Sequence, residues 1–337
     1  MEEKRAFGRL PGGETVHALT IGADALEVTL LSLGARFADM RFRTRDGWQR
    51  VILGFPDLAG FVAPNSRYFG AVVGRCANRI GGGRFSLDGR TYTLPLNERG
   101  RTHLHGGTIG FSGQVWRVAE HTPTVAAFAL TSPDGDEGYP GTVEATCRYQ
   151  VTGSAELSVV LSATIDRPSP VNLACHPFFD LDGNGDIRDH ELEICAESRT
   201  PVDADKIPTG AIIPVSETEW DFRLARPIRS ETHFDDNFVT GSAPVAEPRR
   251  VATLTGAKTR IRLDLLSTEP GLQFYDGSVL AVTEPGFEGR RYGPFSGLAL
   301  EPQLFPDSPN HPEFTDAILR PGEHYRQHTI YRFSQTL

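Results

Sequence analysis

Short runs of alternating hydrophobic and polar residues recur along most of the chain and predict β-strands. Successive side chains of a strand point to opposite faces, so an alternating run places one face in a core and the other toward solvent. The clearest pair is Thr142–Val151 and Glu156–Ile165, which a short polar turn joins. Glu14–Ile21 and Ala25–Ser32 form a second predicted hairpin.

Helical patterns are few and short by comparison, being limited to Pro56–Phe61 and a turn near Glu217–Phe222. The 35 glycines and 24 prolines favour turns over long helices. Many short strands at a spacing of about ten residues are typical of an all-β sandwich or barrel. We therefore predict one large antiparallel β-domain over residues 1–337. Its further strands are expected at Arg50–Leu53, Tyr68–Val73, Arg84–Leu87, Thr91–Leu94, Gln114–Glu120, Val125–Thr131, Glu191–Ala196, Arg250–Leu254, Arg260–Leu265, Leu272–Tyr275, Gly297–Glu301 and Tyr325–Phe333.

Composition excludes several classes of protein. With 39% hydrophobic and 23% charged residues, the chain has the balance of a folded globular protein. A net charge of −9 without a basic run argues against nucleic-acid binding, which depends on neutralising phosphates. No apolar run reaches the roughly 18 residues of a membrane span, and the segment 1–5 leads into no signal-peptide core, so we expect a cytoplasmic protein without a membrane partner.

The four cysteines show no C-x-x-C spacing, which predicts reduced thiols rather than a disulfide framework or a metal knuckle. Cys175 adjoins His176, but neighbours on an extended segment point to opposite faces, so a catalytic role for this thiol is the weaker interpretation. The other three are Cys76, Cys147 and Cys195.

Two histidine contexts stand out as candidate proton-transfer sites. His103 and His105 precede a pair of glycines, and in an extended segment both imidazoles would lie on one face. A cupin-type metal site would also use H-x-H, but positions 106–110 lack the glutamate that such a site adds. His176 ends an extended run and precedes a proline and two phenylalanines. Histidine is the natural proton shuttle near neutral pH.

Glu301 is the most distinctive carboxylate, because it follows the apolar run Leu298–Leu300. A carboxylate at the end of a buried strand tends to have a raised pKa and can act as a base, although backbone donors can also satisfy it. Asp235 and Asp236 suggest polyol or cation recognition, or a solvated turn. The chain has no nucleophile elbow, phosphate loop or dinucleotide fingerprint. This residue set suits binding a polyhydroxyl ligand and moving protons, with no cofactor.

The segment 68–80 contains the sequence G-R-x-A-N-R-I, and Phe178 and Phe179 belong to an N-x-x-x-H-x-F-F motif. With further motifs in the same chain order, these segments resemble the aldose 1-epimerases, the family of the galactose mutarotases. The resemblance covers nearly the whole chain and implies a large antiparallel β-sandwich of the galactose mutarotase type. It also implies interconversion of the α and β anomers of free aldoses, hexoses such as glucose or galactose. The remaining motifs lie at 34–35, 51–55, 104–107, 134–141, 172–181, 234–238, 270–275 and 300–303.

The resemblance assigns roles to individual positions. Glu301 would be the general base, His176 the general acid, and His105 a residue that holds and polarises the sugar near its ring oxygen. The sugar hydroxyls would be bound by Asn78, Arg79, Asp235 and Gln273. One position departs from the pattern: the family usually has D-H-N-F, whereas Asp236 replaces that histidine here.

The implied reaction needs only side chains. Glu301 would remove the proton of the anomeric hydroxyl while His176 protonates the ring oxygen; the open aldehyde would rotate and close on its other face. This cycle starts from an ionised Glu301 and a protonated His176, which their mutual attraction is expected to favour. Phe178, Phe179 and Tyr275 are candidates to stack on the sugar ring, with core packing as the alternative.

Two other functions on the same fold stay open. An epimerase of phosphorylated hexoses would need an arginine clamp, for which Arg290 and Arg291 are the candidate pair. A non-catalytic sugar-binding module would not need both His176 and Glu301. The expected partner is a small aldose, with no nucleic acid or membrane, and the expected assembly is a monomer or weak homodimer.

Overall fold

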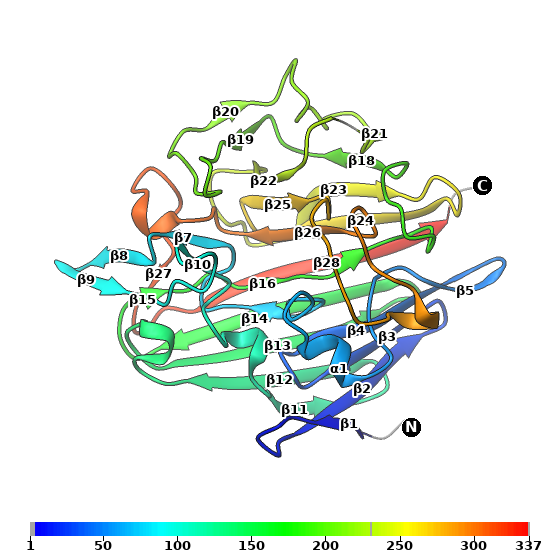
Figure 1. Cartoon of the computed structure of the whole chain (residues 1–337), viewed down its shortest axis with the longest axis horizontal. Coiled ribbons are helices and arrows are strands. Elements are labelled where there is room, and N and C mark those ends of the chain that lie inside the picture. Colours follow the sequence, from blue (N-terminus) through cyan, green and yellow to red (C-terminus); the bar gives the residue numbers. More distant parts are fainter. Residues whose placement is uncertain (1–3, 230, 336–337) are drawn as a thin grey trace.

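The computed structural model describes residues 4–229 and 231–335, and nearly all of its regular structure is β-strand (Figure 1). Three antiparallel sheets of nine, six and five strands are joined by four two-stranded ribbons. Within the described residues, no helix is long and apolar enough to cross a bilayer. The helical elements are α1 (Leu58–Val62) and the 3-10 turns η1 (Phe111–Gly113), η2 (Asp136–Gly138), η3 (Phe287–Gly289) and η4 (Ser308–Asn310).

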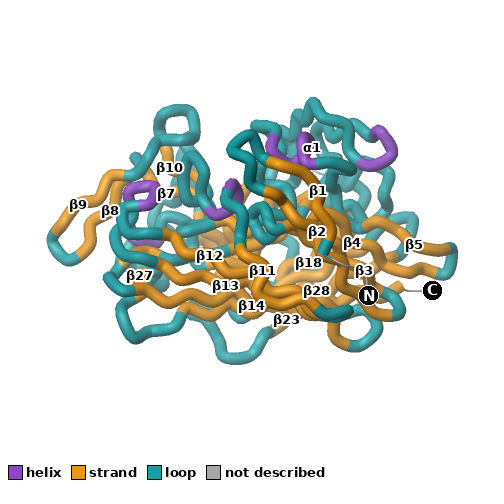
Figure 2. Tube along the Cα trace, turned by 90° about the horizontal axis from the view of Figure 1, so that it is seen from below, coloured by secondary structure: helices purple, strands orange, loops and turns teal. Residues whose placement is uncertain are grey.

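The nine-stranded sheet forms one layer of the molecule, opposite α1 and many of the loops (Figure 2). Its central hairpin confirms the prediction from alternation: Val143 pairs with Ile165 and Thr152 with Glu156, and every second residue is buried. In spatial order its strands are β11 (Arg117–His121), β12 (Val125–Ser132), β13 (Val143–Thr152), β14 (Glu156–Ile165), β28 (Tyr325–Gln335), β24 (Ile261–Ser267), β23 (Arg249–Thr255), β18 (Glu191–Ile194) and β21 (Arg226–Pro227).

The two smaller sheets and the ribbons complete the architecture. The six-stranded sheet has the order β17 (Phe178–Phe179), β26 (Leu298–Gln303), β25 (Gly271–Tyr275), β22 (Asp235–Val239), β19 (Ser198–Thr200) and β20 (Ile213–Pro214). The five-stranded sheet runs β1 (Arg5–Arg9), β2 (Thr15–Ala23), β3 (Leu26–Leu31), β4 (Arg36–Thr44) and β5 (Gly47–Arg50). The ribbons pair β7 (Arg79–Gly81) with β10 (Thr102–Leu104), β6 (Val72–Val73) with β16 (Ala174–Cys175), β8 (Arg84–Leu87) with β9 (Arg90–Thr93), and β15 (Ser169–Pro170) with β27 (Ile318–Leu319).

The core lies between the nine-stranded sheet and the two smaller sheets. Phe37 of β4 packs edge-on against Tyr149 of β13 and Tyr331 of β28, with ring centroids 5.0 and 5.9 Å apart. Phe179 of β17 reaches the same Tyr331 at 6.0 Å. Both smaller sheets therefore cover one face of the large sheet, and the predicted β-sandwich is confirmed.

Strand β4 was not predicted, because two buried charged residues interrupt its hydrophobic pattern. Arg36 is 1% exposed, and its guanidinium donates to the carbonyl oxygens of Leu33 (2.8 Å) and Ser112 (2.6 Å). The strands predicted at Arg50–Leu53 and Tyr68–Val73 are wrong over most of their length: β5 ends at Arg50, and β6 covers two residues. Their apolar side chains fill the core from loops instead.

Candidate active site

Six of the seven predicted site residues line one cleft of about 470 Å³. They come from segments far apart in the sequence, and the sheet topology brings the segments together. Gln273 is not among the lining residues; it is 3% exposed and stands behind Asp235. The six are Asn78, Arg79, His105, His176, Asp235 and Glu301.

His176 and Glu301 form a buried pair at the floor of the cleft. Glu301 lies in the middle of β26, where Gln273 of β25 is its cross-strand partner. His176 follows β16, and its backbone is held by bonds to Ala71 O (3.0 Å) and from Gly70 N–H (2.9 Å). The two side chains approach to 3.5 Å between Nε2 and Oε1. Cys175 packs into the core instead, in line with the weaker interpretation of its thiol.

Burial sets the protonation of this pair. It raises the pKa of Glu301 well above its usual range, and the nearby Asp235 carboxylate adds to that shift. Burial also lowers the pKa of His176 to about 4. Both shifts favour the uncharged form of the group, a protonated carboxyl for Glu301 and a neutral imidazole for His176. The expectation that mutual attraction keeps both groups charged is wrong here, because desolvation penalises each charge more than the partner stabilises it.

His105 is held as a hydrogen-bond donor toward the cleft. Its backbone N–H donates to Asn78 O (2.9 Å), and Asn78 N–H donates to its Nδ1 (3.1 Å). Because Nδ1 accepts, the proton of the neutral ring sits on Nε2. Burial and the neighbouring His176 lower the pKa of His105 well below its usual value, which keeps the ring neutral.

A possible metal donor set also arises here, since the ligand atoms of His105, His176 and Glu301 lie within 4.8 Å of one another. Two histidines and a carboxylate are the ligands of many iron sites. A metal-bound histidine normally donates its second ring N–H to an acceptor. The Asn78 amide imposes the opposite tautomer on His105, so this nitrogen donates to a ligand oxygen more readily than it binds a cation.

His103 lies outside the cleft, so the expectation that it shares a face with His105 is wrong. Its Nε2 bonds the Tyr139 hydroxyl at 2.8 Å, its Nδ1 contacts Pro95 O at 2.9 Å, and its side chain has no exposed surface. The chain leaves the extended conformation at His105, whose φ is 50°, and the alternation of faces ends there.

Arg79 and Asp235 form the polar wall of the cleft, supported by residues the sequence did not reveal. Arg79 donates to both carboxylate oxygens of Glu98, at 2.7 and 2.9 Å, and lies 3.6 Å from Asp235. Gln273 Nε2 donates to Asp235 Oδ1 at 2.7 Å. Thr102 donates to Glu98 at 2.6 Å. Glu98 lies outside the motifs found in the sequence, and only the folded chain shows that it orients Arg79.

Asp236, the position that departs from the family pattern, faces away from the cleft. Its neighbour Asp235 lines the cleft, and adjacent residues of a strand point to opposite sides. Asp236 accepts a hydrogen bond from Arg199 at 2.8 Å, and that guanidinium lies 3.8 Å from the Trp220 ring centroid. The extra negative charge is thus neutralised behind the sheet.

Aromatic side chains line part of the cleft. Phe178 and Tyr275, both candidates from the sequence, border it together with Tyr68, whose ring centroid lies 4.6 Å from that of His105. Phe179 does not: it is fully buried against Tyr331, again because neighbouring strand residues face opposite ways.

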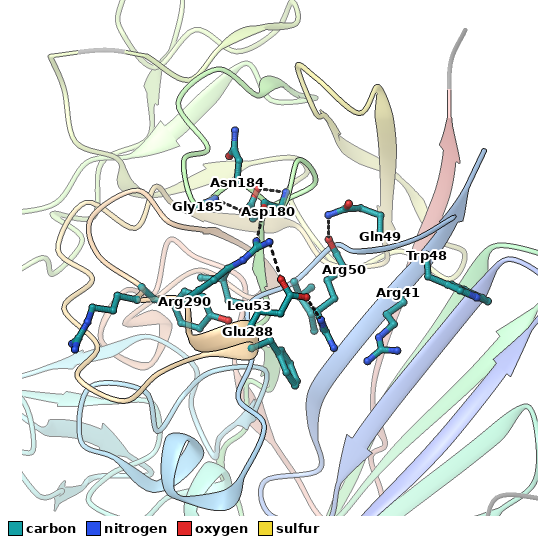
Figure 3. A pocket seen from close by; sticks show the side chains of 15 residues that line it. Arg41, Trp48, Gln49, Arg50, Leu53, Asp180, Asn184, Gly185, Glu288 and Arg290 are labelled. Atoms are coloured by element: carbon teal, nitrogen blue, oxygen red, sulfur yellow. Dashed lines mark hydrogen bonds and ion pairs between the residues drawn. The ribbon is translucent and has the colours of Figure 1, made fainter. Parts of the chain in front are cut away.

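The arginine pair predicted as a phosphate clamp lies elsewhere. Arg290 and Arg291 line a different cavity of about 410 Å³, which among the described residues shares none with the acid–base cleft (Figure 3). Glu288 bridges Arg290 and Arg50 there, at 3.1 and 2.9 Å. The pair therefore does not contact a ligand held between His176 and Glu301.

Comparisons with known proteins agree with the motifs. A family model described as aldose 1-epimerase matches residues 17–332. The galactose mutarotase of Mus musculus is 40% identical, with 98% of each chain covered, and the aldose 1-epimerase of Escherichia coli K12 is 38% identical with 96% covered. The crystal structure of an aldose epimerase homologue from C. elegans superposes with a TM-score of 0.88 at 30% identity, covering 96% of this chain and all of that one.

Proposed function

Since the chain belongs to the aldose 1-epimerase family and interconverts the anomers of an aldose, we propose that Glu301 and His176 are its proton-transfer pair. The observation that carries the proposal is their buried contact of 3.5 Å at the floor of a cleft. Glu301 Oε2 and His176 Nδ1 have no hydrogen-bond partner among the described residues. A sugar hydroxyl would supply the missing donor to Glu301.

Substrate binding would set the charge state that the reaction needs. Hydroxyls that donate to Glu301 favour its carboxylate form, so a proton held by Glu301 before the sugar binds would pass to His176. The pair keeps one proton throughout. Glu301 then accepts the proton of the anomeric hydroxyl as His176 protonates the ring oxygen, and the C1–O5 bond breaks to give the aldehyde.

Ring closure reverses these transfers. After rotation about C1–C2, Glu301 returns its proton to the new anomeric hydroxyl oxygen, and the ring hydroxyl gives its proton back to His176 as it attacks C1. His105 Nε2–H would donate to the sugar near its ring oxygen, and Arg79 and Asp235 would bind hydroxyls farther along the ring. Phe178 and Tyr275 offer apolar surface to the ring itself.

We propose free hexoses such as galactose or glucose as the substrates. Relatives at about 40% identity carry the name galactose mutarotase, and the Arg290–Arg291 pair lies outside the cleft. A buried acid–base pair also argues against a module that only binds sugar, because binding does not need desolvated groups that exchange a proton.

Polarimetry with freshly dissolved α-D-galactose and α-D-glucose tests the proposal. Glu301→Gln and His176→Asn should each lower kcat by about 10²–10⁴-fold, since each removes one positioned proton transfer. His324→Gln removes an exposed histidine outside the cleft and should keep the wild-type rate. Circular dichroism verifies folding, and full activity in either cleft variant would remove the assignment.

A further inference from the structure

A second cavity of about 350 Å³ opens beside the acid–base cleft. The two share four lining residues, which are Arg79, Asp235, Tyr275 and Val279. Neither His176 nor Glu301 lines the second cavity. This side cavity therefore lies on the other side of the shared Arg79–Asp235 wall from the His176–Glu301 pair.

The acidic residues of the side cavity are already engaged. Glu98 accepts two hydrogen bonds from Arg79, and Asp235 accepts one from Gln273. Asp205 forms an ion pair with Arg101 at 2.9 Å. Arg79 is the ion-pair partner of both Glu98 and Asp235, so these two carboxylates have one cation between them.

Two cations of the side cavity have no such partner. Arg99 and Lys206 both line it, and neither forms an ion pair with a carboxylate in the parts of the chain that the structure describes. Lys206 is held in place by its backbone, since its N–H donates to Asp203 O at 3.1 Å and Asp203 Oδ1 accepts from Asp205 and Ile207. The four basic side chains that line the side cavity thus outnumber its three carboxylates by one, in a chain with a net charge of −9.

We propose that the side cavity is a subsite for a negatively charged group, a carboxylate or a phosphate, carried by the aldose away from its anomeric carbon. The inference rests on the proposed function, because it takes the anomeric carbon to lie between His176 and Glu301. Arg99 offers a planar guanidinium for two oxygens of the anion, and Lys206 offers a point charge. The enzyme then epimerises acidic aldoses in addition to neutral ones.

The expected effect is modest and depends on salt. Arg99 is exposed and Lys206 is half-buried, so their attraction for an anion acts through a largely aqueous medium. At an ionic strength of 0.01 M the screening length is about 30 Å, against about 3 Å at 1 M. We therefore expect a preference of about threefold to tenfold at low salt that disappears at high salt.

The test compares kcat/KM for galactose, galacturonate and galactose 6-phosphate by polarimetry. In Arg99→Gln/Lys206→Gln, the ratio of acidic to neutral substrate should fall about threefold to tenfold at low salt, while galactose turnover is unchanged. Arg117→Gln removes the same charge from an exposed position on β11 and should leave every ratio unchanged. The two acidic sugars show whether the subsite favours carboxylate or phosphate.

Each outcome decides the matter. Two results overturn the subsite and leave the proposed function intact, provided that galactose is turned over at the wild-type rate. One is that the double variant keeps the wild-type ratios of acidic to neutral substrate. The other is that the wild-type enzyme turns over neither acidic sugar. Absence of turnover on galactose itself overturns the proposed function, and the subsite falls with it. Loss of the preference in the double variant and in 1 M NaCl, with galactose unaffected, supports the subsite.

Discussion

Two buried histidine–carboxylate pairs lie in the part of the chain that the structure describes, and one of these two lines the cleft. His176 and Glu301 are 3.5 Å apart, and His190 and Asp180 are 3.7 Å apart. All four side chains are at most 7% exposed. Burial shifts both pairs in the same sense, lowering the pKa of each histidine and raising that of each carboxyl.

The pairs differ in what satisfies the carboxylate. Asp180 accepts backbone N–H bonds from Gly183 (2.9 Å) and Gly185 (2.8 Å), and Leu181 N–H donates to His190 Nε2 at 3.0 Å. Asp180 is visible among these glycines at the edge of the arginine-lined cavity (Figure 3). Glu301 has no backbone donor to its Oε2.

This difference separates a structural pair from a reactive one. Backbone N–H groups of Gly183 and Gly185 hold the Asp180 carboxyl in place, so the Asp180–His190 pair stabilises this loop. The unsatisfied oxygen of Glu301 leaves a hydrogen bond for a ligand to make, and the charge state of that pair then depends on the ligand. Close approach of a histidine and an acid therefore does not identify an active site on its own; the two pairs are told apart by an unsatisfied carboxylate oxygen together with a place in the cleft.

The largest effect on kcat is expected when both groups of the His176–Glu301 pair are replaced. In the double variant His176→Asn/Glu301→Gln, kcat should fall by about 10²–10⁴-fold, no further than in the worse single variant. The losses do not multiply, because the two proton transfers belong to one step and the loss of either group already removes it. Polarimetric rates of the wild type, the two single variants and the double variant measure the kcat losses. Losses that multiply in the double variant would show that the two groups act independently.

A third buried carboxylate sharpens the comparison, since Glu269 lies outside the cleft yet also has an unsatisfied Oε2. Burial raises its pKa to about 8. The unfolded chain releases this proton near pH 4.5, whereas the folded chain keeps it until about pH 8, so the wild-type protein loses stability as the pH rises between these values.

The variant Glu269→Gln has no proton to release at this position, so its free energy of unfolding should not fall in this way as the pH rises. Its free energy of unfolding should exceed that of the wild type by an amount that grows with pH and reaches about 3 kcal/mol at pH 7. Urea denaturation at pH 5 and pH 7 measures the difference, and kcat should not change. A pH-independent difference would mean that Glu269 is ionised in the folded protein.

Breaking the structural pair should cost stability and spare activity. Asp180→Asn replaces one acceptor oxygen by an NH₂ group next to the backbone N–H groups of the 183–185 loop, and should lower the free energy of unfolding by about 1–3 kcal/mol. Asp186→Asn, at a half-exposed position in the same loop, is the matched control, with an expected change below about 0.5 kcal/mol. A fall in kcat of Asp180→Asn beyond a few-fold would contradict the structural role.

The smallest expected effect is the pH profile of the reactive pair. Because the pKa of His176 is lowered to about 4 in the free enzyme, kcat/KM should show no inflection near 6.5. It should fall only below about pH 4, roughly tenfold per pH unit, as His176 takes up a second proton while Glu301 is already protonated. Rates from pH 4.5 to 8 suffice, since a midpoint near 6.5 would show that the histidine titrates as if exposed.

Local pattern and chain order predicted the fold and singled out the candidate site residues. Alternation alone located the β13–β14 hairpin, because a strand with one buried face has hydrophobic residues at every second position. The ordered motifs pointed to His176 and Glu301 without any knowledge of their distance. Alternation failed at β4, where Arg36 is buried because carbonyl oxygens from other segments satisfy its guanidinium.

Only the tertiary structure decided how those residues act. The contact between residues 176 and 301, the support of Arg79 by Glu98, the tautomer of His105 and the outward direction of Asp236 all depend on segments that meet only after folding. The pKa values follow the same rule, since burial is a property of the whole fold and it lowers the pKa of His176 and raises that of Glu301. The sequence names chemical groups, whereas solvent exclusion and hydrogen-bond partners from distant strands give those groups their reactivity.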